Sequence, residues 1–165
     1  MNINDRAKLA TQLLMHEGLR LRVYRDTKGY RTIGVGFNLD ARGVAALEAL
    51  IGRKFSGSIT REEALAILNH DIEHFEAEVR RRLPVYEKFD AIRQRVIVDM
   101  AFNLGYKSLR FEKAIAALNR GDFATCGREM RLSKWSTDVG DGPGGKFDRA
   151  DRLIAMMTSG RDYES

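Results

Sequence analysis

One stretch of the sequence, Leu19–Leu39, departs from the helical periodicity that governs most of the chain. Apolar side chains alternate there with polar ones, and Asp26–Gly29 supplies the chemistry of a turn between two short strands. Gly34 and Gly36 interrupt the second strand and indicate a bend or a close approach of the backbone. These residues predict a small antiparallel sheet of two or three strands in an otherwise helical chain. The predicted fold class is α+β, predominantly α.

Helices with apolar residues at three- and four-residue steps account for the rest of the chain. A first helix is expected from a cap at Asn4 to Gly18. The capping box Thr60–Glu63 opens the longest helix, which extends to about Arg82. With about 20 residues it is roughly 30 Å long, enough to join two lobes. Further helices are predicted at Ala41–Ile51, Asp90–Leu104, Phe111–Asn119, Phe123–Leu132 and Arg149–Thr158.

The length of 165 residues suits a single domain built as two lobes around a shared core. We expect an N-terminal lobe at about 13–60, the joining helix at about 60–82, and a helical C-terminal lobe at about 83–165 that includes the first helix. Hydrophobic residues (44%) and charged residues (31%) occur in the proportions of a soluble globular protein, which excludes a disordered chain. No transmembrane segment is expected.

Cysteine content and charge limit the compartment and the partners. Cys126 is the only cysteine, so no disulfide within the chain is expected, and folding in a reducing cytoplasm is suitable. Asp5, Arg6 and Lys8 lie where the apolar core of a signal peptide would be, so no ordinary cleaved signal is expected. The net charge of +5 favours an anionic partner, and nucleic acid, an acidic membrane and the bacterial cell wall all qualify.

Two carboxylates and a hydroxyl near the predicted hairpin have the chemistry of a glycosidase. Such an enzyme needs one carboxylic acid to protonate the leaving oxygen and a second carboxylate to activate water or attack the sugar. Glu17 closes the first helix, Asp26 begins the turn, and Thr32 lies on the returning strand. A glutamate at a helix end and an aspartate at a turn are common in any protein, so this pattern alone leaves the function open.

The segment that contains these residues closely resembles the catalytic segment of the bacteriophage lysozymes, family 24 of the glycoside hydrolases. It reads HEGLRLRVYRDTKGYRTIGVGFNL, with Asp26 nine residues after Glu17 and Thr32 six residues further, followed by Ile-Gly-Val-Gly. The resemblance continues in order over most of the chain. It includes Ile51–Arg53, Gly57–Ala64, Val85–Tyr86, Asp90–Arg93, Met100–Gly105, Ser133–Trp135, Arg149–Arg152 and Thr158–Gly160.

The resemblance implies a role for each site residue. Glu17 is expected to be the general acid, while Asp26 positions the attacking water and Thr32 helps to hold it. Phe102 and Asn103 are expected to line the sugar cleft between the lobes. Arg149 is the expected cation near Glu17. No metal and no cofactor are implied.

The same resemblance implies an endolysin that hydrolyses the β-1,4 bond between N-acetylmuramic acid and N-acetylglucosamine in bacterial peptidoglycan, with inversion at the anomeric carbon. The expected enzyme is a monomer that accumulates in the host cytoplasm. A holin-type membrane permeabiliser is expected to give it access to the wall in the periplasm, where it lyses the host cell.

Two positions depart from the family pattern. Phe37 stands where the family's best-known member has a histidine, so an ion pair made by that histidine cannot form. The helix segment Arg128–Leu132 does not match the family's sugar-contact position well. Neither departure affects Glu17, Asp26 or Thr32.

Other motifs favour structural interpretations. His70, Glu73 and His74 fit the spacing of certain zinc peptidases. The apolar residues of the same helix mark its buried face, which indicates that these three residues lie on its solvated side. No nucleic-acid-binding motif accompanies the basic run Arg80–Arg82, so no nucleic-acid partner is expected. The preferred interpretation of the run is a solvated basic helix face that attracts the protein to an anionic cell wall.

Three further side-chain groups carry similar alternatives. Asp138 and Asp141 lie in a glycine-rich loop whose spacing does not fit a calcium-binding EF-hand. Trp135 is expected in the core rather than stacked on a sugar. Cys126 is expected to be a small buried residue rather than a nucleophile.

Two other functions are compatible with part of the pattern. A lytic transglycosylase cuts the same bond but needs no water-holding carboxylate, which disfavours it because Asp26 and Thr32 have the family spacing. A wall-binding module without turnover would require the carboxylates to be incidental.

Overall fold

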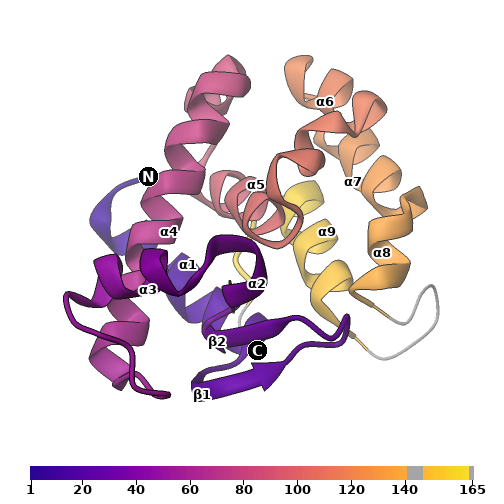
Figure 1. The fold of residues 1–165 in the computed structure, drawn as a ribbon. Helices are drawn as coiled ribbons and strands as arrows, with labels where there is room; N and C mark the ends of the chain where they lie inside the picture. The colour runs from indigo at the N-terminus through magenta and orange to yellow at the C-terminus, as the bar shows by residue number, and fades with distance from the viewer. Residues whose placement is uncertain (141–146, 164–165) are drawn as a thin grey trace. The chain divides into compact units, whose positions relative to one another are not determined.

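The computed structural model describes residues 1–140 and 147–163, without the side chains of Tyr106 and Lys107. The chain divides into two compact units, residues 2–74 and residues 75–165 with Met1, called here the N-terminal unit and the C-terminal unit. The long helix α4 (Arg61–Arg82) runs through the boundary (Figure 1). Helix α1 (Ile3–Glu17) belongs to the N-terminal unit, whereas the sequence-based division grouped it with the C-terminal lobe. Each unit is described by itself.

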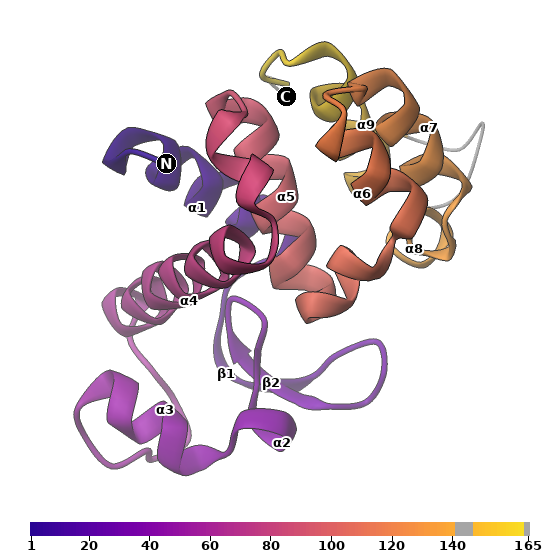
Figure 2. The same cartoon turned by 90° about the horizontal axis from the view of Figure 1, so that it is seen from above.

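The N-terminal unit contains a small antiparallel sheet with strand order β1-β2-β3 among helices, which confirms the predicted fold class (Figure 2). After α1 its elements are β1 (Arg20–Arg25), β2 (Arg31–Gly34), β3 (Phe37–Asn38), α2 (Leu39–Arg42), α3 (Val44–Ile51) and the first part of α4. The core of the unit is made by apolar side chains from the sheet and from the helices that follow it. Its buried members are Ile33, Phe37, Leu39, Leu47, Ile59, Ala64 and Ile67.

Helix ends in this unit follow local capping chemistry. The predicted cap at Asn4 is wrong, because the side chain of Asn2 accepts the hydrogen bond from the Asp5 amide at 2.9 Å and α1 begins earlier. The capping box that opens α4 is confirmed by two reciprocal hydrogen bonds between Thr60 and Glu63, at 2.8 and 3.1 Å. The single helix predicted at Ala41–Ile51 is instead α2 and α3, because Gly43 adopts a φ of +86° that ends one helix and begins the next.

The C-terminal unit is helical. After α4 it comprises η1 (Pro84–Lys88), α5 (Ala91–Leu104), η2 (Gly105–Arg110), α6 (Glu112–Asn119), α7 (Phe123–Leu132), α8 (Lys134–Asp138) and α9 (Arg149–Ser159). The predicted helices α5, α6, α7 and α9 are confirmed to within one residue at each end. The short elements η1, η2 and α8 were not predicted, because one turn of helix is too short to show a period. No helix among the described residues is long and apolar enough to cross a membrane.

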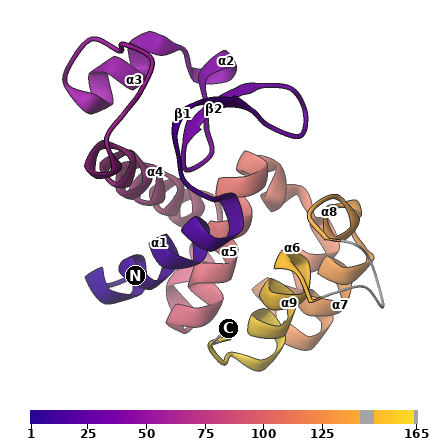
Figure 3. The same cartoon turned by 90° about the horizontal axis from the view of Figure 1, so that it is seen from below.

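Helices α7 and α9 lie side by side in this unit (Figure 3). Their close approach occurs at Gly127, where an added Cβ would collide with the hydroxyl of Thr158. Helix α5 is buried along most of its length, from Gln94 to Ala101. The core of the C-terminal unit is therefore packed around α5, as its apolar sequence predicted.

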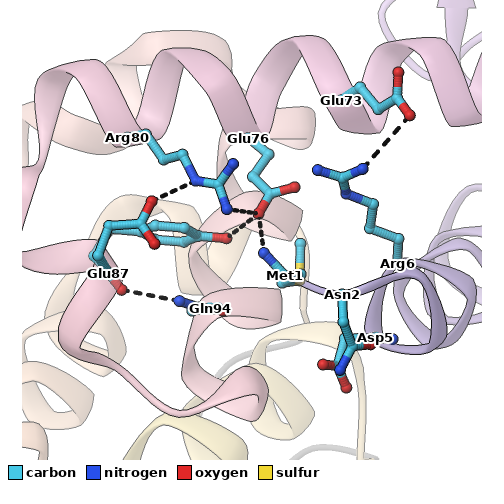
Figure 4. Close-up of polar contacts among 10 residues, drawn as sticks. Met1, Asn2, Asp5, Arg6, Glu73, Glu76, Arg80, Glu87 and Gln94 are labelled. Atoms are coloured by element: carbon cyan, nitrogen blue, oxygen red, sulfur yellow. Dashed lines mark hydrogen bonds and ion pairs between the residues drawn. The ribbon is translucent and has the colours of Figure 1, made fainter.

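A buried polar cluster ties α4 to η1 and α5 in the C-terminal unit (Figure 4). Glu76 is almost fully buried and accepts a hydrogen bond from the Tyr86 hydroxyl at 3.1 Å, while its carboxylate pairs with Arg80 at 3.1 Å and with the Met1 ammonium group. Gln94 donates to the Tyr86 carbonyl oxygen at 3.1 Å. Burial, and then the charge of Glu76, raise the pKa of Tyr86 well above its usual range, so this phenol stays protonated.

Candidate active site

Glu17 is the last residue of α1 and is half-buried. The helix ends there because Gly18 takes a φ of +74°, and the Gly18 amide still donates to the Leu14 carbonyl oxygen at 3.0 Å. The chain then turns directly into β1. The predicted helix end at Gly18 is thereby confirmed, and it fixes the position at which the Glu17 side chain leaves the helix.

Asp26 begins the turn between β1 and β2, and the hairpin backbone holds its carboxylate. Oδ1 accepts hydrogen bonds from the amides of Lys28 and Tyr30, each at 2.9 Å. The Asp26 amide donates to the Tyr30 carbonyl oxygen at 2.9 Å, and the Gly29 amide donates to the Asp26 carbonyl oxygen, also at 2.9 Å. Within residues 1–140 and 147–163, Oδ2 makes no hydrogen bond. One carboxylate oxygen is therefore fixed by the main chain, while the other is available to orient water.

Thr32 lies on β2, where its side chain is 3% exposed. Its hydroxyl donates to the Tyr30 carbonyl oxygen at 3.1 Å, so the hydroxyl oxygen retains only its capacity to accept hydrogen bonds from other groups. In the antiparallel pairing, Thr32 is directly opposite Tyr24 of β1. Side chains directly opposite each other project from the same face of a sheet, so the Thr32 hydroxyl and the Tyr24 ring are neighbours.

Tyr24 is a site residue that the sequence analysis missed. Burial raises the pKa of its phenol, and the nearby charges of Glu17 and Asp26 raise this pKa further. Both carboxylates therefore act on the Tyr24 phenol from within the N-terminal unit. The turn could have identified this residue, because a hairpin closed between Asp26 and Tyr30 places Tyr24 opposite Thr32. Asp26 and Thr32 thus share the hairpin that carries Tyr24, and the charge of Glu17 also acts on this tyrosine.

The three residues predicted to bind substrate all belong to the C-terminal unit. Phe102 and Asn103 are partly exposed residues near the end of α5, and the Phe102 ring packs against Phe75 with 5.6 Å between ring centroids. Arg149 is the first residue of α9, and its guanidinium donates twice to the buried Asp99 carboxylate, at 2.7 and 3.1 Å. Their expected places along a sugar cleft, and that of Arg149 beside Glu17, stay predictions.

The position at which the family has a histidine is occupied by the buried Phe37. The guanidinium of Arg42 lies over the Phe37 ring, 4.0 Å from its centroid. The same guanidinium forms two hydrogen bonds to Asp71, at 2.6 and 2.9 Å. A cation therefore links this aromatic ring to α4, which provides a structural role for the position without a histidine.

The motif His70–His74 does not assemble a metal site. Glu73 pairs with Arg6 at 3.6 Å, and the His70 ring nitrogen Nδ1 lies 3.3 Å from the Asp71 carboxylate. In the part of the chain that the structure describes, no three His, Cys, Asp or Glu side chains are placed to hold a metal ion. Asp138 pairs with Lys134 at 2.8 Å, while Asp141 of the glycine-rich loop lies outside the described residues.

The basic run Arg80–Arg82 is largely neutralised by neighbouring carboxylates. Arg80 pairs with Glu76, and Glu78 pairs with both Arg81 at 2.6 Å and Arg82 at 3.2 Å. The Glu78 contacts are i, i+3 and i, i+4 pairs of an exposed helix face, whereas Arg80 reaches the buried Glu76. They favour the structural interpretation of the run over a nucleic-acid patch.

The two other residues considered from the sequence are core residues of the C-terminal unit. Trp135 is 2% exposed and Cys126 is 1% exposed. Burial raises the pKa of the Cys126 thiol to about 12, so the thiolate needed of a nucleophile is not formed at neutral pH. Both predictions of a buried residue are confirmed.

Comparisons with known proteins identify the family of the chain. The sequence model of the phage lysozyme family matches residues 15–151. The chain is 31% identical over 146 residues to the pre-baseplate central spike protein Gp5 of Enterobacteria phage T4, covering 80% of this chain but only 25% of the spike protein. It is 26% identical over 169 residues to a probable T4-type lysozyme of Dictyostelium discoideum, covering 93% and 95% of the two chains. An endolysin of Acyrthosiphon pisum secondary endosymbiont phage 1 is 29% identical over 126 residues, or 73% and 72%.

The class of protein follows from these matches: the chain is a glycoside hydrolase of the muramidase type. It belongs to the phage lysozyme family, as the resemblance of its catalytic segment implied.

Proposed function

We propose that this protein hydrolyses the β-1,4 bond between N-acetylmuramic acid and N-acetylglucosamine in bacterial peptidoglycan, and that it thereby lyses the host cell as an endolysin. The observation that carries the proposal is the hairpin that holds Asp26 by two main-chain amides and places Thr32 opposite Tyr24, directly after the helix that ends at Glu17. A carboxyl group at a helix end and a carboxylate on a hairpin supply the acid and the water-positioning group of a glycosidase. Accumulation in the host cytoplasm, a monomeric state and a holin-type partner stay predictions.

The proposed reaction inverts the anomeric carbon. Glu17 donates its proton to the leaving glycosidic oxygen as the bond to the anomeric carbon breaks. A water held by Asp26 Oδ2 and by the acceptor oxygen of Thr32 attacks that carbon from the opposite face, and Asp26 accepts its proton. This geometry requires roughly 6.5–9.5 Å between the two carboxyl groups so that the water fits. The fixed Oδ1 of Asp26 keeps the other oxygen in one orientation throughout.

Analysis of the products tests the proposed reaction. Purified peptidoglycan digested with the protein is expected to yield fragments with reducing muramic acid ends, detected by mass spectrometry. Fragments that end in 1,6-anhydromuramic acid would instead identify a lytic transglycosylase.

Proton NMR during the first minutes of digestion is expected to show the α-anomer of the new reducing end, since inversion converts the β bond. Initial release of the β-anomer would contradict the inverting mechanism.

Replacement of Asp26 by Asn is expected to reduce the turnover rate about 100-fold. The amide oxygen of Asn can still accept hydrogen bonds from Lys28 and Tyr30, so the hairpin is retained, but the negative charge and the acceptor at Oδ2 are lost. Release of reducing ends from sacculi measures the effect. Asp26→Ala serves as the structural comparison, because it also removes both hydrogen bonds and should lower the melting temperature, whereas Asp26→Asn should not. Undiminished turnover by Asp26→Asn would exclude the carboxylate from the reaction.

A further inference from the structure

The hairpin around Asp26 carries the densest positive charge of the N-terminal unit. Residues 20–31 include four arginines and one lysine, but Asp26 is their single acidic residue. Strand β1 is exposed at five of its six residues, and Lys28 at the turn is exposed as well. The hairpin that positions the candidate catalytic carboxylate is therefore also rich in exposed basic residues.

Most of these cations have no counterion in the part of the chain that the structure describes. Arg31 forms an ion pair with Asp40 at 2.7 Å, and the hydrogen bond from the Arg31 amide, followed by that from its side chain, lowers the pKa of the Asp40 carboxyl group. Arg20, Arg22, Arg25 and Lys28, called here the hairpin cations, form no ion pair with any residue in the ranges 1–140 and 147–163. The basic run on α4 differs, because nearby glutamates neutralise it. Exposed cations without internal partners have their charge available to a ligand.

The hairpin cations share one hairpin with Asp26, and the side chains of Arg25 and Arg20 contact that hairpin. The Lys28 amide donates to Asp26 Oδ1 at 2.9 Å, and the Arg25 guanidinium donates to the Gly29 carbonyl oxygen across the turn at 2.8 Å. The Arg20 guanidinium lies over the Tyr24 ring, 5.7 Å from its centroid. A substrate whose glycosidic bond lies beside Asp26 would therefore bring any nearby anionic group to these cations.

We propose that the hairpin cations bind the carboxylates of the short peptides attached to muramic acid, and that they make the enzyme selective for peptidoglycan with free carboxylates. This inference rests on the proposed function. The N-acetylated sugar rings of the glycan are uncharged, so the anionic groups nearest to the scissile bond are those of the peptide on the adjoining muramic acid. Positive charge beside Asp26 matches that chemistry.

The size of the expected effect follows from the exposure of these side chains. One exposed ion pair changes an equilibrium constant by a factor of about 1.5 to 5 at moderate salt. Removing two such charges, Arg22 and Lys28, should therefore raise KM about fivefold and leave kcat unchanged. Arg25 and Arg20 are kept in this variant because they contact Gly29 and Tyr24. The effect should diminish as salt shortens the electrostatic range from about 10 Å at 0.1 M to about 3 Å at 1 M.

The test uses soluble, uncross-linked peptidoglycan strands in two forms, one with free carboxylates and one in which carbodiimide and methylamine have converted them to methylamides. The wild-type enzyme is expected to have a KM more than fivefold lower on the free form. Arg22→Gln/Lys28→Gln is expected to show a preference reduced about fivefold, because only Arg20 and Arg25 remain to bind the carboxylates. The matched control, Arg61→Gln/Lys88→Gln, removes one exposed arginine and one exposed lysine elsewhere and should keep the wild-type preference.

The outcomes separate the two proposals. A preference for free carboxylates that persists undiminished in Arg22→Gln/Lys28→Gln would overturn the role of the hairpin cations. An equal loss of preference in the control variant would attribute the effect to overall charge and would overturn it too. Failure of the wild-type enzyme to release reducing ends from either form would instead refute the proposed function. Steric hindrance by the added methylamides affects all three proteins alike and leaves the comparison between variants intact.

Discussion

Replacement of Glu17 by Gln is expected to reduce lysis of outer-membrane-stripped Gram-negative cells by 10²- to 10⁴-fold. Gln has nearly the same size and can occupy the end of α1, but its amide cannot supply a proton to the leaving oxygen. The expected defect is therefore in kcat, with the helix and its Gly18 terminus retained. The decrease in turbidity of the cell suspension measures the rate, and circular dichroism verifies that the variant is folded.

A second readout distinguishes an enzyme from a wall-binding module. The Glu17→Gln variant should still co-sediment with sacculi as the wild-type protein does, because binding does not require proton donation. Glu62→Gln provides the control, since it makes the same chemical change at an exposed residue in the first turn of α4 and should retain full activity. Wild-type turnover by Glu17→Gln would remove this residue from the mechanism.

Replacement of Asp99 by Ala is expected to lower the free energy of unfolding by about 3–5 kcal/mol. Asp99 is fully buried, and the side chain of its partner Arg149 is only 9% exposed. Arginine remains protonated inside proteins, so the variant keeps a buried guanidinium but removes both hydrogen bonds from Asp99. Since 1 kcal/mol corresponds to about 2–4 °C for a protein of this size, the melting temperature should fall by roughly 6–20 °C.

The comparison for this prediction is an ion pair of the same charge type at the surface. Asp138→Ala breaks the pair with Lys134, whose side chain is 85% exposed, and should cost less than about 1 kcal/mol. Asp99→Asn should be intermediate, because the amide oxygen still accepts from the guanidinium while the charge is lost. Equal melting temperatures for Asp99→Ala and Asp138→Ala would mean that the buried pair does not stabilise the C-terminal unit.

Local sequence signals predicted much of the fold. The capping box at Thr60 and Glu63 defines the start of α4 in the sequence because both partners are three residues apart. The break at Gly43 was missed, since a glycine inside an apolar periodic segment does not reveal whether it adopts a positive φ. Asn2 and Asn4 are equally suitable as caps by composition, and only the hydrogen bond to Asp5 distinguishes them.

The candidate site was predicted less completely than the fold. Glu17, Asp26 and Thr32 were identified by their family spacing, and their local hydrogen bonds then explain how Asp26 and Thr32 are held. Tyr24 was missed because its contribution depends on strand register rather than on its own residue type. The Asp99–Arg149 pair joins residues 50 positions apart, so no local pattern in the sequence could reveal it.

Because main-chain amides hold Asp26, the charge of the turn and the orientation of the Asp26 carboxylate can change independently of each other. The amides of Lys28 and Tyr30 are present whatever side chains those positions carry, as long as neither is proline. Exposed residues of the turn can therefore exchange one charge for another without reorienting the carboxylate. Related enzymes could adapt to differently modified cell walls by changing the exposed residues of this turn, while the catalytic reaction stayed the same.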